Sequence, residues 1–94
     1  MGLGDRRVLL LAGCAGFRLV AEDGAVGVVD TPLFPWATAA PDFLVARTGS
    51  RLHPRRPVVP VTLVTDVDPV ERVVSVAGTR SEIAALPEHL PVAG

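Results

Sequence analysis

Several residue types are scarce or missing from this chain. It has no Lys and no Tyr, and aromatic residues make up only 4% of its 94 residues. All nine basic residues are therefore Arg, and the core has to be built from Val, Leu, Ile and Ala, among which the abundant Val favours strands. Cys14 is the only Cys, which excludes an intramolecular disulfide and a Cys-rich zinc site. A reducing compartment, the cytoplasm, is the expected location.

The chain also lacks a long hydrophobic run and a strong net charge. Its longest apolar run, residues 8–13, is far shorter than the roughly 18 residues that a membrane-spanning helix needs, so we expect no membrane span. The net charge of −1 argues against bulk affinity for nucleic acid. With 49% hydrophobic and 20% charged residues, the chain has the composition of a folded protein, and its length suits one domain.

The segment Leu11-Ala12-Gly13-Cys14 matches the lipobox of bacterial lipoproteins, and two Arg residues precede its apolar run. That run is shorter than the roughly 7–15 residues of a signal-peptide core. We therefore expect residues 1–15 to form a short helix or an extra strand, with Cys14 as a small buried apolar residue. A lipid anchor on Cys14 is the alternative.

After residue 16, short Val-rich stretches separated by Gly, Pro and Asp predict an all-β domain. The expected strands cover residues 17–21, 25–30, 43–48, one or two strands within 58–67, and 72–77. Asp23-Gly24 predicts a tight turn between the first two strands, and Gly27 predicts a bulge or bend. The expected fold is a small, strongly bent barrel of about five to six strands.

Proline residues divide this pattern. Pro32, Pro35 and Pro41 predict a loop over residues 31–42, because three residues without an amide donor do not fit a central ladder. Trp36 lies in the middle of this loop. Pro60 predicts an edge position or a bend, with strand continuing over residues 61–64.

The C-terminal part carries two local signals. Asp68-Pro69 has the residues of a type I turn between two strands. Thr79 and Glu82 match a capping box, which predicts a short helix that ends before Pro87. We expect the domain to cover residues 16–87 and residues 88–94 to be a flexible tail.

The order of these motifs resembles that of the PRC-barrel family. It includes Gly-Phe-Arg-Leu-Val at residues 16–20, the Asp23-Gly24 turn, Val-Gly-Val-Val at 26–29, a strand ending in Gly49 and Val-Val-Pro-Val at 58–61. The resemblance implies a small bent barrel with scaffolding and docking roles, as in the photosynthetic reaction-centre H subunit and a ribosome-maturation factor. The family has no shared catalytic residues, so none is carried over.

No residue pattern points to catalysis, a metal or a cofactor, and we expect no enzyme activity. Neither His53 nor His89 lies in a nucleophile motif, and Asp66, Asp68 and Glu71 lack the Gly-centred loop of a calcium site. The candidate partner-binding residues are Trp36, Arg47, Arg51, His53, Arg55 and Arg56.

These residues favour a non-enzymatic protein-interaction or assembly module, whose partner is an unidentified protein or a second copy paired through edge strands. The alternative is an RNA-binding or ribosome-associated protein that uses the basic segment from Arg47 to Arg56. Nucleic acid is the less favoured partner, because no aromatic residue accompanies these basic residues to provide a stacking platform for nucleobases.

Overall fold

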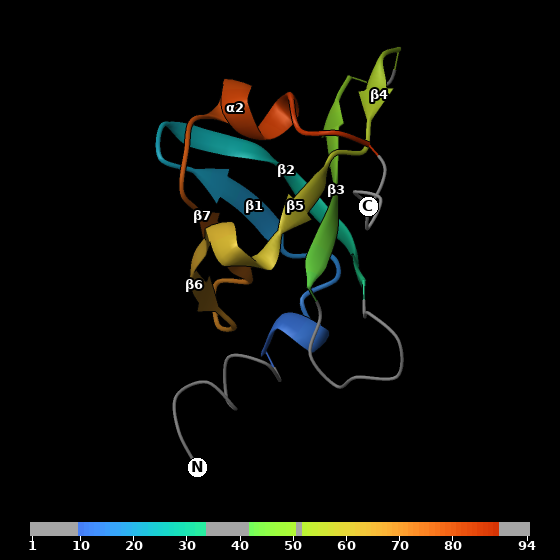
Figure 1. Cartoon of the computed structure of the whole chain (residues 1–94). Coiled ribbons are helices and arrows are strands. Elements are labelled where there is room, and N and C mark those ends of the chain that lie inside the picture. Colours follow the sequence, from blue (N-terminus) through green and yellow to red (C-terminus); the bar gives the residue numbers. More distant parts are fainter. Residues whose placement is uncertain (1–9, 34–41, 51, 89–94) are drawn as a thin grey trace.

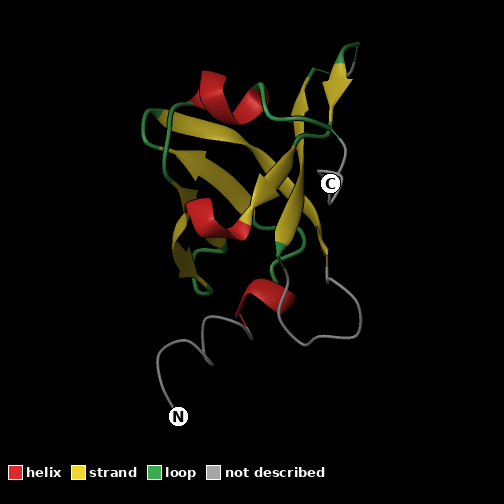
Figure 2. Cartoon of the chain, viewed as in Figure 1, coloured by secondary structure: helices red, strands yellow, loops and turns green. Residues whose placement is uncertain are grey.

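Seven strands form one mixed sheet in the computed structural model, which describes residues 10–33, 42–50 and 52–88 (Figures 1 and 2). In chain order the elements are β1 (Arg18–Ala21), β2 (Gly24–Leu33), β3 (Phe43–Gly49), β4 (Pro54–Arg55), β5 (Val58–Pro60), the 3-10 helix η1 (Val61–Leu63), β6 (Val64–Asp68), β7 (Val73–Val76) and α2 (Arg80–Ala84). The strand order is β4-β3-β2-β1-β7-β6, and β5 also pairs with β3. The predicted mostly β fold with a short C-terminal helix is confirmed.

The hairpin of β1 and β2 forms where the sequence predicts it. Ala21 pairs with Gly24, whose φ of 138° explains why a glycine follows Asp23 at the turn. Leu19 pairs with Gly27 and Val20 with Ala25, so one residue beside Gly27 is bulged, as predicted. A Cβ atom on Gly27 would collide with the backbone carbonyl of Arg47. Gly27 therefore also permits the close approach of β3.

Strand β2 is longer than predicted, since it continues through Thr31 and Pro32 to Leu33. The expectation of a loop from residue 31 was wrong at this point. The amide of Asp42 donates to the carbonyl of Leu33 (3.0 Å), so the backbone polar groups of Leu33 point towards β3. Hydrogen-bonding direction alternates along an antiparallel strand, so the backbone nitrogen of Pro32 points to the opposite edge of β2. β1 pairs with β2 only as far as Val28, so the missing amide of Pro32 breaks no ladder. Residues 34–41 of the expected loop lie outside the described residues.

The chain bends at Pro60, as predicted, and then departs from the prediction. Residues 61–63 form η1 instead of continuing the strand, with Pro60 as the N-terminal cap at a φ of −62° and a ψ of 136°. This short helix carries the chain from β5, which pairs with β3, to β6, which pairs with β7. β5 and β6 are separate, which the expected five to six strands allow, and the two residues of β4 add the seventh strand. Among the described residues the path of paired strands is open, with β4 and β6 at its ends.

Two predicted local motifs are present near the C-terminus. The side chain of Asp68 accepts hydrogen bonds from the amides of Val70 (3.0 Å) and Glu71 (3.1 Å), which closes the turn between β6 and β7. Thr79 and Glu82 form the complete capping box of α2. The last strand begins at Val73, one residue later than predicted, because Arg72 has a φ of 59°.

The core is mostly aliphatic, as the composition predicts, with Phe17 and Cys14 added to it. Its buried members are Leu11, Cys14, Phe17, Leu19, Ala21, Val29, Leu44, Ala46, Val59, Val64, Val67, Val74, Val76 and Ile83. Residues 10–12 form a helical turn, which lies at the opposite end of the molecule from α2 (Figure 2). Through Leu11 and Cys14 this segment belongs to the same core as the sheet.

Candidate functional site

A β-hairpin made by β3 and β4 extends away from the rest of the sheet (Figure 1). Thr48 pairs with Arg55 and Gly49 with Pro54. Gly49 has a φ of 84°, and a Cβ atom there would collide with the carbonyl of His53, so this position requires glycine. The Leu52 side chain in the connection is 85% exposed. We call residues 47–50 and 52–56 the arm.

The arm carries most of the predicted partner-binding residues. Arg47, His53, Arg55 and Arg56 are all exposed on it. Trp36 and Arg51 lie outside the described residues, so the structure does not place them relative to this group. The four described basic residues thus share one projecting element. The sequence already indicates their proximity, because they lie within ten positions of one another.

Two of these bases have acidic partners that sequence spacing does not reveal. Arg55 Nη2 lies 3.6 Å from Glu88 Oε2, and Arg56 Nη1 lies 3.4 Å from Asp30 Oδ2. Glu88 also accepts a hydrogen bond from the backbone amide of Arg56 (2.7 Å). Both arginine side chains remain about half exposed or more, so these ion pairs contribute little to stability and can exchange partners.

Two shallow hollows of about 330 and 370 Å³ lie where the arm joins the sheet, and both are lined by Val26, Thr48 and Gly49. The Thr48 hydroxyl is buried and has no hydrogen-bond partner within the described part of the chain. A buried hydroxyl without a partner is costly, so this residue is an exception among the buried side chains of the fold. Arg47 lines one hollow, and Arg55 and Arg80 line the other.

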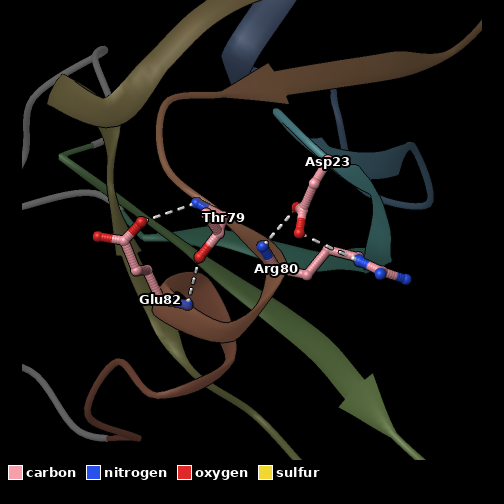
Figure 3. Close-up of polar contacts among 4 residues, drawn as sticks. All are labelled: Asp23, Thr79, Arg80 and Glu82. Atoms are coloured by element: carbon pink, nitrogen blue, oxygen red, sulfur yellow. Dashed lines mark hydrogen bonds and ion pairs between the residues drawn. The ribbon is translucent and has the colours of Figure 1, made fainter.

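A polar cluster joins the β1–β2 turn to the start of α2 (Figure 3). The carboxylate of Asp23 accepts a hydrogen bond from the Arg80 amide (2.8 Å), and its Oδ2 lies 3.6 Å from Arg80 Nε. The hydrogen bond from this backbone amide, helped by the guanidinium charge, lowers the pKa of Asp23. Glu22 accepts a hydrogen bond from the amide of Gly78 (2.7 Å). These carboxylates, which the sequence shows only as turn residues, anchor the helix.

Cys14 is fully buried and its thiol is free. Burial raises its pKa to about 11 from an ordinary 9.0, which disfavours the reactive thiolate. In residues 10–33, 42–50 and 52–88, no three His, Cys, Asp or Glu side chains gather as potential metal ligands. No helix within these ranges has the length and hydropathy needed to cross a bilayer.

Comparisons with known proteins do not assign the chain to a family. No protein-family model matches it, and no curated protein matches it. The resemblance to the PRC-barrel family therefore stays a prediction that rests on the order of short motifs. Any functional proposal has to come from the residues and their geometry.

Proposed function

We propose that this chain is a non-enzymatic protein-interaction or assembly module built on a small, strongly bent barrel of the PRC type. The observation that carries the proposal is the arm, a projecting hairpin that presents the exposed side chain of Leu52 among basic residues. Such a surface suits docking of another protein.

The bent-barrel part of the proposal is supported by the path of the chain around η1. β5 pairs with β3, near one end of the strand order, and β6 pairs with β7 at the other end. Only the three residues of η1 separate β5 from β6, and the amide of Ala77, just after β7, donates to the carbonyl of Leu63 (2.8 Å). The two sides of the sheet are therefore linked by one short bent segment, as in a small barrel whose strand turns a corner.

The docking role of the arm is supported by its exposed apolar side chain. β4 pairs with β3 alone, and Leu52 contributes almost no buried surface to the fold. Burying a Leu side chain fully against a partner contributes about 1.5–3 kcal/mol. Flanking arginines, which are enriched in interfaces, would add polar contacts to an acidic partner.

The RNA-binding alternative uses the same residues and remains a second prediction with less support. The exposed apolar side chain of Leu52 favours a protein partner, because a protein surface can bury it whereas phosphate and ribose groups cannot. If RNA binds, its affinity must fall with added salt and with replacement of Arg55 and Arg56 by Ala.

A cytoplasmic location fits this proposal better than a lipid anchor. Leu11 and Cys14 both belong to the buried core. Cleavage before Cys14 would remove Leu11 from that core and expose the Cys14 backbone. Intact mass spectrometry decides the question, because a diacylglyceryl adduct on a chain beginning at Cys14 would overturn the cytoplasmic assignment.

The test of the proposed function is capture of partners by matched variants. We expect the tagged wild-type chain to retain a partner protein from native lysate, Leu52→Ser to retain less of it, and Thr62→Ala to retain as much as the wild type. Thr62 is the control because it is exposed in η1, away from the arm and from the turn between β6 and β7. The proposal fails if nothing is captured above background and the chain is strictly monomeric by light scattering at high concentration. Undiminished retention by Leu52→Ser would show that the arm is not the docking element.

A further inference from the structure

Two large hydrophobic side chains are exposed in the described residues, and each lies at the end of a hairpin. Leu52 is in the arm, and Val70 is in the turn between β6 and β7. Both side chains are more than four-fifths exposed. Figure 1 places β4 and β6 at opposite ends of the molecule, so one copy of the chain does not bring the two side chains together.

The two hairpins carry opposite charge. The arm carries Arg47, Arg55, Arg56 and His53; the ion pairs of Arg55 with Glu88 and of Arg56 with Asp30 are exposed, so these two arginines can exchange partners. The other hairpin carries Asp66, Asp68 and Glu71, and none of these three carboxylates forms an ion pair with any described residue. We call residues 66–71 the acidic turn.

The neighbouring base does not neutralise the acidic turn. Arg72 follows Glu71, but its guanidinium lies over the ring of Phe17, 5.5 Å from the ring centroid. One carboxylate oxygen of Asp68 accepts hydrogen bonds from the amides of Val70 and Glu71, which fixes the turn, and Val70 in this turn is exposed to solvent. The acidic turn is thus a rigid, negatively charged hairpin end with one apolar side chain.

We propose that the acidic turn of one copy docks on the arm of a second copy, which places Val70 beside Leu52 and carboxylates beside arginines. This inference rests on the proposed function and names its partner. Contact of two arms would oppose Arg to Arg, and contact of two acidic turns would oppose Asp to Asp, so charge selects the head-to-tail arrangement. Each copy then uses two different surfaces, and a third copy can add to either end.

The contact is small, so we expect association to be weak and reversible. Sedimentation velocity of the purified chain over a concentration series should show an average mass that rises with concentration. Raising the salt from ~50 to ~500 mM should reduce this rise, because the charges that meet are exposed and therefore screened.

Two single variants separate the two surfaces. Leu52→Ser disables the arm and leaves the acidic turn intact, whereas Val70→Ser does the reverse. Each variant alone should associate at least roughly tenfold more weakly than the wild type. Both substitutions are at exposed positions, so unchanged circular dichroism and unchanged thermal unfolding are expected and would show that the fold is kept.

The decisive measurement is the equimolar mixture of the two variants. The intact arm of one variant can bind the intact acidic turn of the other, so the mixture should form 1:1 dimers and nothing larger. A mixture that stays monomeric while the wild type associates would overturn the head-to-tail arrangement. A wild type that is monomeric at every concentration would overturn self-association altogether. Capture of a different protein through Leu52 would then leave the proposed function standing with another partner.

Discussion

The buried hydroxyl of Thr48 provides a sharp test of the packing beneath the arm. Replacing Thr48 by Val keeps a β-branched side chain of nearly the same shape in strand β3 and removes the hydroxyl that has no partner among the described residues. An unsatisfied buried polar group costs about 1–3 kcal/mol. We therefore expect Thr48→Val to raise the free energy of unfolding by about 1–2 kcal/mol, within that range. This sign is unusual, since most single substitutions destabilise a protein.

The assay is urea unfolding followed by circular dichroism at low protein concentration, with thermal unfolding as a second measurement. For a domain of this size, each kcal/mol raises Tm by roughly 4–8 °C. The slope of the free energy against urea should stay the same, because the surface exposed on unfolding hardly changes.

Two further variants separate the hydroxyl from other effects. Thr48→Ser keeps the hydroxyl and removes a buried methyl group, so it should destabilise the fold by about 1 kcal/mol. Thr65→Val makes the same chemical change at an exposed position of β6 and should stay within about 0.5 kcal/mol of the wild type. If Thr48→Val destabilises the fold while Thr65→Val is neutral, the Thr48 hydroxyl has a hydrogen-bond partner and the reasoning is refuted.

Three other substitutions or reactions test separate features. Gly27→Ala should lower the free energy of unfolding by about 2–4 kcal/mol in the same urea assay, because its Cβ collides with the Arg47 carbonyl; a neutral effect would mean that β2 and β3 separate easily. Cys14 should react with a thiol-specific disulfide reagent at least about tenfold more slowly in the folded chain than in urea. A pKa of about 11 against 9.0 reduces the thiolate fraction about a hundredfold, and the greater nucleophilicity of the more basic thiolate offsets roughly tenfold of this loss. Equal rates would contradict the burial of Cys14. Asp23→Asn should destabilise the fold at neutral pH, and the difference in stability from the wild type should shrink as the pH falls below 3.8. A carboxyl group with a lowered pKa stabilises the fold above its ordinary pKa and loses this effect as it is protonated. A difference independent of pH would rule out the charge of Asp23 as the cause.

The features that the sequence predicts well are those whose chemistry is local. The Asp23-Gly24 turn, the Asp68-Pro69 turn and the Thr79 capping box each depend on residues at most three positions apart, and all three are confirmed. A backbone position that requires positive φ, or a helix start that requires a side-chain acceptor, limits the choice of residue directly.

The features that the sequence misses depend on neighbours that are distant along the chain. Pro32 is compatible with β2 only because β1 has already ended beside it, and this depends on how three strands align. The same holds for η1, which forms between β5, a strand that pairs with β3, and β6, a strand that pairs with β7.

The candidate site shows the same division. Clustering of basic residues between positions 47 and 56 is visible in the sequence, but the ion pair of Arg56 with Asp30 joins the segment after β4 to the distant strand β2. The link between Asp23 and Arg80 spans 57 positions. The exposure of Leu52 and Val70 is also tertiary information, because an apolar residue in a Val-rich sequence is more often buried than exposed.

The parallel pairing of β1 with β7 has a consequence for synthesis of the chain. Arg18 pairs with Val73 and Leu19 with Val74, so the first strand receives one of its two neighbours only when the last strand has been made. A β1–β2 hairpin that forms before then would have one unpaired edge and would leave the side chain of Leu19 uncovered. The sheet is therefore completed only after Val73–Val76 has left the ribosome, and truncation before Val73 is expected to yield an aggregation-prone product instead of a smaller stable domain.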